Sequence, residues 1–201
     1  MRLAVLASGY GSNLQAIINA VQSGEIDGSL VVVISDQRDA YALNRATDAG
    51  IEALFLAPSS FSGRDAYDRE IVSQLQKRQV DLIILAGFMR LLSPHFVREF
   101  GGRIMNIHPS LLPAFPGLDG VKQALAYGVK VSGCTVHFVD EGLDTGQIIL
   151  QEGVTVYDSD TESSLQERIH TVEHRLYPRA VQLYIQGKLQ VDGRRCLVDE
   201  S

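Results

Sequence analysis

Asn106 and His108 are the residues whose types and spacing most directly indicate chemistry. They lie in the segment Ile104-Met-Asn-Ile-His108, directly before a proline-rich stretch at 109–117. If this segment is a strand, side chains two positions apart project to the same face, so an amide and an imidazole lie side by side. The amide can donate to a developing oxyanion, and the imidazole can donate or accept a proton near neutral pH, which suits acyl transfer. A hydrogen-bonded core histidine is the alternative interpretation.

Asp144, in Leu143-Asp-Thr-Gly146, is the third candidate. Asp and Gly favour turns for local reasons, so a plain turn is the alternative interpretation. If Asp144 meets His108, the carboxylate would raise the pKa of the imidazole from its reference value of about 6.5 and fix the orientation of the ring. The sequence alone does not establish that the two residues meet.

A glycine-containing loop, Ser8-Gly-Tyr-Gly-Ser-Asn13, precedes a segment with helical periodicity. Glycines let backbone approach a ligand closely, and free N–H groups at a helix N-terminus favour an anion such as phosphate. Asp36 lies about where the ribose-binding acid of a dinucleotide fold is found, but Leu14 replaces the third glycine of G-x-G-x-x-G. We therefore favour a monophosphate over a dinucleotide. A glycine turn that binds no ligand stays open as an alternative.

Alternating strands and helices must position these residues. Unbroken apolar runs at 3–7 and 30–34 predict strands that are buried on both faces, and the same pattern recurs with strands predicted at 53–56 and 81–86. Helical periodicity and glycine stop signals predict a helix between the first two strands and further helices at 40–49, 64–78 and 94–99. This alternation predicts an α/β fold that is Rossmann-like, with a mostly parallel twisted sheet flanked by helices on both faces.

The second half of the sequence has a different pattern. We expect strands at 131–139 and 147–156, and a hairpin at 189–198 around Asp192-Gly193. Between them, Ser159 and Glu162 have the spacing of a capping box and predict the start of a helix, which Pro178 should kink or divide.

Composition excludes several classes of protein. Apolar residues make up 45% and charged residues 21% of the 201 residues, which is ordinary globular usage. The net charge of −6 and the scattered basic residues argue against nucleic acid as a partner. The longest apolar run, 82–89, is far shorter than the roughly 20 residues of a membrane span, and no secretory signal is recognisable, so we expect a cytoplasmic protein without a membrane partner. Cys134 and Cys196 lack metal-binding spacing and are expected to be packing thiols.

Four motifs in this order resemble the phosphoribosylglycinamide formyltransferase family, the folate-dependent glycinamide ribonucleotide transformylases. They are Ser8-Gly-x-Gly-Ser-Asn13, Leu85-Ala-Gly-Phe-Met-Arg90, Asn106-Ile-His-Pro-Ser-Leu-Leu-Pro113 and Gly133-Cys-Thr-Val-His-Phe-Val-Asp-Glu-Gly-Leu-Asp-Thr-Gly146. The resemblance runs from residue 1 to about residue 190. It implies transfer of a formyl group from 10-formyltetrahydrofolate, as co-substrate, to the amino group of glycinamide ribonucleotide in purine (IMP) biosynthesis.

The resemblance also implies the partners and the organisation of the chain. The partners are the two small molecules, no metal is needed, and the expected state is a monomer or weak homodimer. We expect one formyltransferase domain over 1–201, with a ribonucleotide phosphate half at about 1–100, a folate-binding and catalytic half at about 101–188, and a short C-terminal tail.

Site residues follow from the same resemblance. The catalytic set is Asn106, His108 and Asp144, with Asn106 and protonated His108 stabilising the oxyanion and Asp144 keeping His108 charged. The ribonucleotide set comprises Gly11, Ser12 and Asn13 at the phosphate, Glu173 at the ribose hydroxyls, and His170. The folate set comprises Arg64, Met89, Arg90, Leu91, Leu92, Asn106, Val139, Asp140 and Asp144. The chain departs from the family at Asp119, where members carry a histidine.

Other functions remain as alternatives. A formyltetrahydrofolate hydrolase or another folate-dependent N-formyltransferase, such as the methionyl-tRNA enzyme, resembles the chain around Asn106, His108 and Asp144. Those relatives carry a further domain, so the extent of this chain favours the glycinamide ribonucleotide enzyme. A nicotinamide-dependent dehydrogenase or a non-catalytic phosphate-binding protein would use the glycine loop but explains none of the three catalytic candidates.

Overall fold

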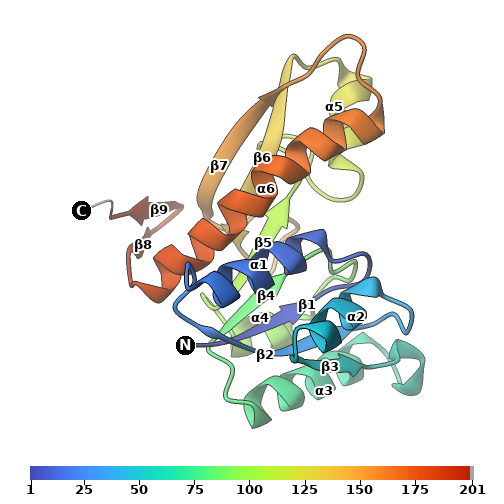
Figure 1. Cartoon of the computed structure of the whole chain (residues 1–201), viewed down its shortest axis with the longest axis vertical. Helices are drawn as coiled ribbons and strands as arrows, with labels where there is room; N and C mark the ends of the chain where they lie inside the picture. The colour runs from blue at the N-terminus through green and yellow to red at the C-terminus, as the bar shows by residue number, and fades with distance from the viewer. Residues whose placement is uncertain (200–201) are drawn as a thin grey trace. The chain divides into compact units, whose positions relative to one another are not determined.

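The computed structural model describes residues 1–199, which form two compact units. Unit 1 is Met1–Met105, and unit 2 begins at Asn106. Figure 1 labels the elements of both. The single domain over 1–201 and its two ligand-binding halves stay predictions, and the last two residues of that domain lie outside the described residues.

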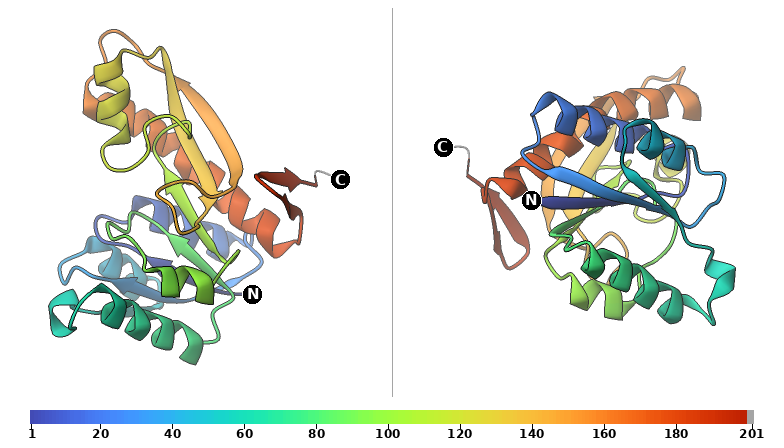
Figure 2. Two further views of the ribbon diagram at one scale, coloured as in Figure 1. Left: turned by 180° about the vertical axis from the view of Figure 1, so that it is seen from behind. Right: turned by 60° about the horizontal axis from the view of Figure 1, so that its bottom comes forward.

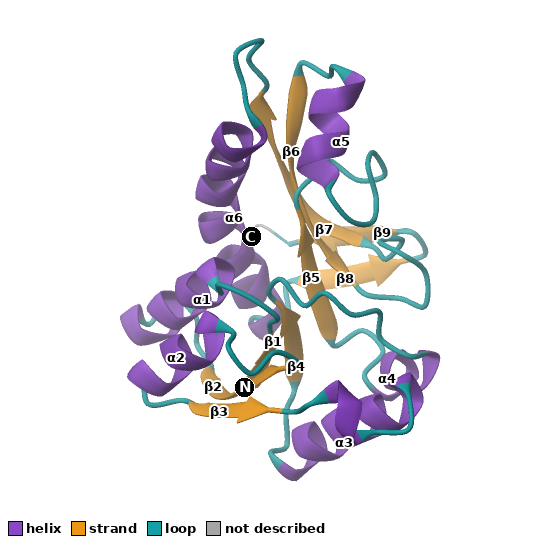
Figure 3. Cartoon of the chain, turned by 90° about the vertical axis from the view of Figure 1, so that its right-hand side faces the viewer, coloured by secondary structure: helices purple, strands orange, loops and turns teal. Residues whose placement is uncertain are grey.

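Unit 1 contains four parallel strands in the order β3-β2-β1-β4. Helices α1 and α2 cover one face of these strands, and α3 and α4 cover the other (Figures 2 and 3). The elements are β1 (Arg2–Leu6), α1 (Ser12–Ser23), β2 (Ser29–Ser35), α2 (Tyr41–Asp48), β3 (Glu52–Phe55), the 3₁₀ turn η1 (Pro58–Ser60), α3 (Arg64–Lys77), β4 (Leu82–Leu85) and α4 (Pro94–Glu99).

Burial on both faces explains why the strands of unit 1 have uninterrupted apolar sequences. Every residue from Leu3 to Leu6 in β1 is completely buried, because β1 lies between β2 and β4 with helices above and below. A strand with one solvent-facing side would instead alternate apolar and polar residues. The predicted mostly parallel sheet flanked by helices is confirmed.

Unit 2 is built around an antiparallel pair of long strands. Strands β6 and β7 pair from Val131↔Thr155 to His137↔Ile148, and α6 packs along both of them (Figure 1). The predicted hairpin is confirmed as β8 and β9, an antiparallel pair that contacts the end of β7. The elements are α5 (Gly120–Tyr127), β6 (Val131–Phe138), β7 (Ile148–Thr155), α6 (Glu162–Ile185), β8 (Leu189–Asp192) and β9 (Arg195–Val198). Strand β5 (Ile104–His108) begins in unit 1 and ends in unit 2.

Three features of unit 2 differ from expectation. Helix α5 was not predicted, although buried Val121 and Ala124 and the closing Gly128 are local signals for it. Helix α6 continues through Pro178 without division. Its capping box uses Thr161 and Ser164 rather than Ser159 and Glu162. The cap is shifted because 157–160 form a turn in which Asp160 N–H donates to the Tyr157 carbonyl, so the helix starts only after Asp160.

Among residues 1–199 there is no helix whose length and apolar content would let it cross a bilayer.

Replacing the α6 N-cap by Thr161→Ala should lower the free energy of unfolding by about 1 kcal/mol. The Thr161 hydroxyl accepts a hydrogen bond from Ser164 N at 3.2 Å, and the substitution leaves that helix-terminal N–H without its side-chain partner. Urea unfolding monitored by circular dichroism measures the change. Ser163→Ala, two residues further along in the same exposed turn, is the matched control. Equal decreases in the free energy of unfolding for the two variants would contradict a capping role.

Candidate active site

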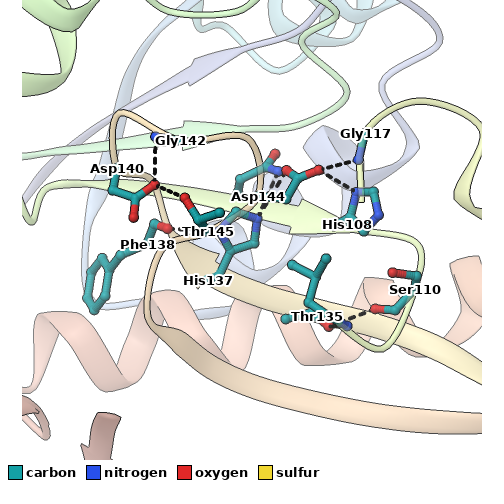
Figure 4. Close-up of polar contacts among 12 residues, drawn as sticks. His108, Ser110, Gly117, Thr135, His137, Phe138, Asp140, Gly142, Asp144 and Thr145 are labelled. Carbon is teal, nitrogen blue, oxygen red and sulfur yellow. Dashed lines mark hydrogen bonds and ion pairs between the residues drawn. The ribbon is translucent and has the colours of Figure 1, made fainter. Parts of the chain in front are cut away.

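Asn106, His108 and Asp144 come together within unit 2, where His137 lies between Asn106 and Asp144. Figure 4 shows His108, His137 and Asp144 of this cluster. Asn106 and His108 lie on β5, and Asp144 lies in the loop that joins β6 to β7. The His108 Nδ1 and Asp144 Oδ2 atoms are 3.5 Å apart, so the meeting that the sequence left open does occur. His108 is 4% exposed, whereas Asn106 is half-buried and therefore reachable by a substrate.

The loop backbone holds the Asp144 carboxylate in place. Asp144 has a left-handed backbone conformation with φ of 53°, which is costly for a residue with a Cβ and persists only where surrounding contacts impose it. Its Oδ2 accepts a hydrogen bond from Gly117 N at 2.7 Å. Nearby, Asp140 Oδ1 accepts from Gly142 N at 3.0 Å and from the Thr145 hydroxyl at 2.6 Å, closing the loop on itself.

Gly146 terminates this loop at a position that excludes every side chain. A Cβ added there would lie 1.7 Å from the Phe138 carbonyl oxygen, so the two ends of the loop approach through bare backbone. The Asp-x-Gly sequence therefore forms a turn and also places the Asp144 carboxylate beside His108. The sequence analysis had treated these two interpretations as alternatives.

Both ring nitrogens of His108 face hydrogen-bond acceptors. Nε2 lies 2.8 Å from the carbonyl oxygen of Phe115, and Nδ1 faces the Asp144 carboxylate. A carbonyl oxygen can only accept, so Nε2 must carry a hydrogen. A hydrogen on Nδ1 would point toward the Asp144 carboxylate, so each ring nitrogen of His108 has an acceptor beside it.

The proline-rich loop after β5 is anchored to the sheet of unit 2. Thr135 on β6 donates its hydroxyl to the Ser110 carbonyl at 2.7 Å and accepts from Leu112 N at 3.0 Å. Gln151 on β7 donates to both the Leu112 carbonyl and the Thr135 hydroxyl at 2.8 Å. These bonds fix the loop that carries the Phe115 carbonyl, and hence the orientation of His108.

His137 is a site residue that the sequence analysis missed. It is 2% exposed, and its Nε2 lies 3.1 Å from Asn106 Nδ2 and 3.7 Å from Asp144 Oδ1. Its Nδ1 lies 2.8 Å from the Phe138 carbonyl and must donate to it, which leaves Nε2 as the acceptor of an Asn106 N–H. His137 thereby orients the Asn106 amide. The available signal was its place on the strand that leads to Asp144.

Burial lowers the pKa of His137, and the hydrogen bond to the Phe138 carbonyl opposes the shift only in part. A neutral ring agrees with the acceptor role of Nε2. The two histidines of the site thus have different partners: His108 has two acceptors, and His137 has one acceptor and one donor.

The predicted phosphate loop lies in unit 1, at the start of α1. Gly11 is the N-cap residue of α1, has φ of 74°, and provides no side-chain cap. The first turn of α1 contains no acidic residue. A Cβ on Gly11 would lie 2.9 Å from the Ala42 Cβ, so only glycine fits between this loop and α2. The uncapped N-terminus has the partial positive charge that favours an anion.

A cavity of about 660 Å³ lies beside this loop in unit 1. It is lined by Ser8, Gly9, Tyr10, Asp36, Gln37, Arg38, Asp39, Ala40, Tyr41, Phe55, Ala57, Pro58 and Ser59. Asp36, the apparent ribose-binding acid, is 5% exposed and accepts a hydrogen bond from its neighbour Gln37. Leu14, at the position of the missing third glycine, is fully buried in the core.

The predicted folate residues of unit 1 follow β4. Met89 and Leu91 are 70% and 61% exposed, which is high for large apolar side chains, whereas Leu92 is half-buried. The segment is held by hydrogen bonds from Met89 N to the Ser8 hydroxyl and from Ser93 N to the Asp68 carboxylate.

The two predicted folate-binding arginines of unit 1 differ in their surroundings. The Arg90 guanidinium lies 5.0 Å from the centre of the Tyr67 ring. Arg64, the first residue of α3, is exposed.

The predicted folate residues Val139 and Asp140 of unit 2 are half-buried at the end of β6. Asp119, the position at which the sequence analysis noted a departure from the family, is exposed and precedes α5 in a left-handed conformation with φ of 60°. Its side chain does not cap that helix, whereas its carbonyl oxygen accepts a hydrogen bond from Gln123 N.

Glu173 on α6 is buried, so it is not an ordinary solvated charge on the helix surface. It is 3% exposed, and its Oε2 lies 4.0 Å from Nε2 of His170. Its charge is felt by Cys134 on β6, where burial, reinforced by Glu173, raises the pKa of the thiol to about 12. Cys134 and Cys196 are both free thiols.

Within residues 1–199, no three His, Cys, Asp or Glu side chains are arranged so that they could hold a metal ion.

Comparisons with known proteins agree with one another. The family model described as formyl transferase matches residues 1–181. The trifunctional purine biosynthetic protein adenosine-3 of Drosophila melanogaster is 53% identical over 188 residues, which cover 92% of this chain but only 14% of the relative's length. Phosphoribosylglycinamide formyltransferase of Escherichia coli (strain K12) is 44% identical over 199 residues, covering 99% of this chain and 94% of that protein. Among solved structures, glycinamide ribonucleotide transformylase 1 from Symbiobacterium toebii has a TM-score of 0.98 at 50% identity, covering 98% of this chain and 93% of the other.

His137 should be neutral at pH 7, with its proton on Nδ1. Because burial lowers its pKa in the folded state, the unfolded chain takes up a proton at this residue as pH falls below about 6.5 while the folded chain does not. The free energy of unfolding should therefore decrease in that range. Nitrogen-15 NMR of the imidazole identifies the tautomer directly, and a doubly protonated His137 at pH 7 would contradict the assignment.

Proposed function

The chain belongs to the formyl transferase family, and from this membership we propose that it transfers the formyl group of 10-formyltetrahydrofolate to the amino group of glycinamide ribonucleotide. The products are N-formylglycinamide ribonucleotide and tetrahydrofolate. The observation that carries the proposal is the cluster of Asn106, His108 and Asp144. The bacterial relative named phosphoribosylglycinamide formyltransferase, matched over nearly its whole length, supports the choice of substrates.

The hydrogen-bond donors of this cluster fit a substrate that contains a formyl group. The co-substrate supplies an electrophilic formyl carbon whose oxygen gains negative charge when an amine attacks it. Asn106 has one amide N–H beyond the one that it directs to His137, and this N–H can donate to that oxygen. Hydrogen-bond donors held in advance at the place where charge develops are usually the largest single contribution to such catalysis.

His108 supplies the positive charge and a mobile proton. Its Nδ1 lies 3.5 Å from Asp144 Oδ2, longer than a usual hydrogen bond of about 2.9 Å, so the Nδ1 proton is not committed to the carboxylate. Asp144 balances the charge of the imidazolium. His108 can therefore stabilise the oxyanion and, directly or through a water, give a proton to the folate nitrogen as its bond to the formyl carbon breaks. It recovers a proton from the nitrogen of the amine that has attacked, so protons balance over the reaction.

The ribonucleotide is held by backbone and by a buried acid. The uncapped α1 N-terminus at Gly11, Ser12 and Asn13 suits its phosphate, and the Glu173 carboxylate suits the ribose hydroxyls, with His170 beside it. The folate residues proposed from the sequence are Arg64, Met89, Arg90, Leu91, Leu92, Asn106, Val139, Asp140 and Asp144. A cytoplasmic location, the absence of nucleic-acid and membrane partners, and a monomer or weak homodimer remain predictions from the sequence.

Mixing the protein with 10-formyltetrahydrofolate should release tetrahydrofolate only when glycinamide ribonucleotide is present. The absorbance change of the folate and the mass of the formylated ribonucleotide measure the two products together. Equal folate release without the ribonucleotide would identify a hydrolase instead. No turnover in either mixture would overturn the proposal.

His108→Gln and Asp144→Asn should each lower kcat at least roughly 10²-fold, the lower range for a group that transfers a proton. Glutamine cannot carry the imidazolium charge, and asparagine cannot balance it. Thermal unfolding shows whether the variants are folded. Asp158→Asn, which removes an exposed carboxylate paired with Lys130, is the matched control and should leave kcat unchanged. A kcat like that of the unmodified enzyme in either site variant would refute the mechanism.

A further inference from the structure

Arg45 on α2 holds the backbone of the glycine loop. Its Nε donates to the carbonyl oxygen of Tyr10 at 2.9 Å, and its Nη1 donates to Oε1 of Gln15 in the first turn of α1 at 2.9 Å. The same loop is tied to α2 by a hydrogen bond from Ala42 N to the Gly9 carbonyl at 3.1 Å. Arg45 therefore bridges the residues on either side of Gly11.

The guanidinium of Arg45 is fixed by two aromatic rings. It lies 4.5 Å from the centre of the Tyr10 ring and 4.8 Å from that of the Tyr41 ring. The two rings stack on each other with centres 5.3 Å apart and planes 13° apart, although Tyr10 is 68% and Tyr41 46% exposed. Contacts of a cation with two rings restrict a side chain that would otherwise sample many rotamers.

The positive charge of Arg45 is not neutralised by an ion pair. In the described part of the chain, no Asp or Glu forms a salt bridge with it, in contrast to Arg78 and Arg168, which pair with Glu52 and Asp160. The charge also lies beside the loop: a Cβ added to Gly11 would be 3.5 Å from the Arg45 Cδ. Ordering this guanidinium and removing water from it cost free energy, and no carboxylate pairs with it. Its charge can therefore act on a bound anion.

We propose that Arg45 is a positioning residue for the phosphate of the ribonucleotide. It holds the Tyr10 carbonyl so that the N–H groups after Gly11 converge, and its unpaired charge favours a phosphate dianion in the loop. The inference rests on the proposed function, because it concerns the phosphate subsite of that reaction. It adds a residue outside the motif and outside the folate set.

Arg45→Gln and Arg45→Lys test the proposal, because the KM for the ribonucleotide should change while kcat and the KM for the folate should not. Arg45→Gln removes the charge and should raise KM for glycinamide ribonucleotide about tenfold, the scale of one lost charge-assisted hydrogen bond. The value of kcat and the KM for the folate should change less than about twofold, because neither depends on the loop. Arg45→Lys keeps the charge but cannot contact both Tyr10 and Gln15 as the guanidinium does, so it should recover only part of the affinity. Calorimetric titration of the ribonucleotide measures binding without turnover.

Arg103→Gln is the matched control. The Arg103 guanidinium lies 5.1 Å from the centre of the Phe100 ring and donates to the Glu99 carbonyl at 2.8 Å, so it resembles Arg45 in its contacts but belongs to none of the predicted site sets. This control should leave both KM values unchanged. If the charge acts on a phosphate, added salt should also weaken ribonucleotide binding more in the unmodified protein than in Arg45→Gln.

Two results would overturn the inference. One is a ribonucleotide affinity in Arg45→Gln equal to that of the unmodified protein, and the other is an equal rise of both KM values, which would indicate a general structural role. If Arg45→Gln does not fold, Arg45→Lys decides the question, because a larger loss of folate than of ribonucleotide affinity there contradicts the proposal. Failure of the proposed function looks different, since the unmodified protein would then neither bind nor formylate the ribonucleotide.

Discussion

A carboxylate held in a nearly closed site beside two imidazoles is the constraint on which the candidate site of unit 2 depends. The Asp144 side chain is only 12% exposed, and a buried charge is tolerated where hydrogen bonds and an opposite charge replace water. Gly117 N–H and the His108 ring provide these partners. Two loops must therefore be in place together: the proline-rich loop that contains Gly117 and the β6–β7 loop that contains Asp144.

The same arrangement gives two neighbouring histidines opposite tasks. His108 faces a carbonyl and a carboxylate, which both accept, whereas His137 faces a carbonyl and an amide N–H. The partners alone determine that one ring suits the charged form and the other the neutral form with a defined tautomer. Placing ionisable groups in environments that separate their protonation states is a general way to run acid–base chemistry near pH 7. Here the separation also orients Asn106, the oxyanion donor, without a further residue.

The proposed phosphate loop follows a different principle, because the groups that would bind the anion belong to the backbone. Gly11 is required by a positive φ and by the close approach of Ala42, so the loop geometry depends on helix α2, which is distant in sequence. Arg45 and the two stacked tyrosines belong to that same contact. The affinity of an anion site made of backbone N–H groups depends on the contacts that hold those groups in position.

Much of the fold, and the candidates for the site, could be predicted from the sequence. Apolar runs such as 3–7 predicted buried parallel strands, and the spacing of Asn106 and His108 placed an amide beside an imidazole, because periodicity is a local property of neighbouring positions. Tertiary structure alone decided that His108 meets Asp144, that His137 orients Asn106 and that Glu173 is buried. These contacts join residues that lie far apart in the chain. They depend on the left-handed backbone at Asp144 and on the close approach of Gly146 to the Phe138 carbonyl, and both follow from packing rather than from residue type.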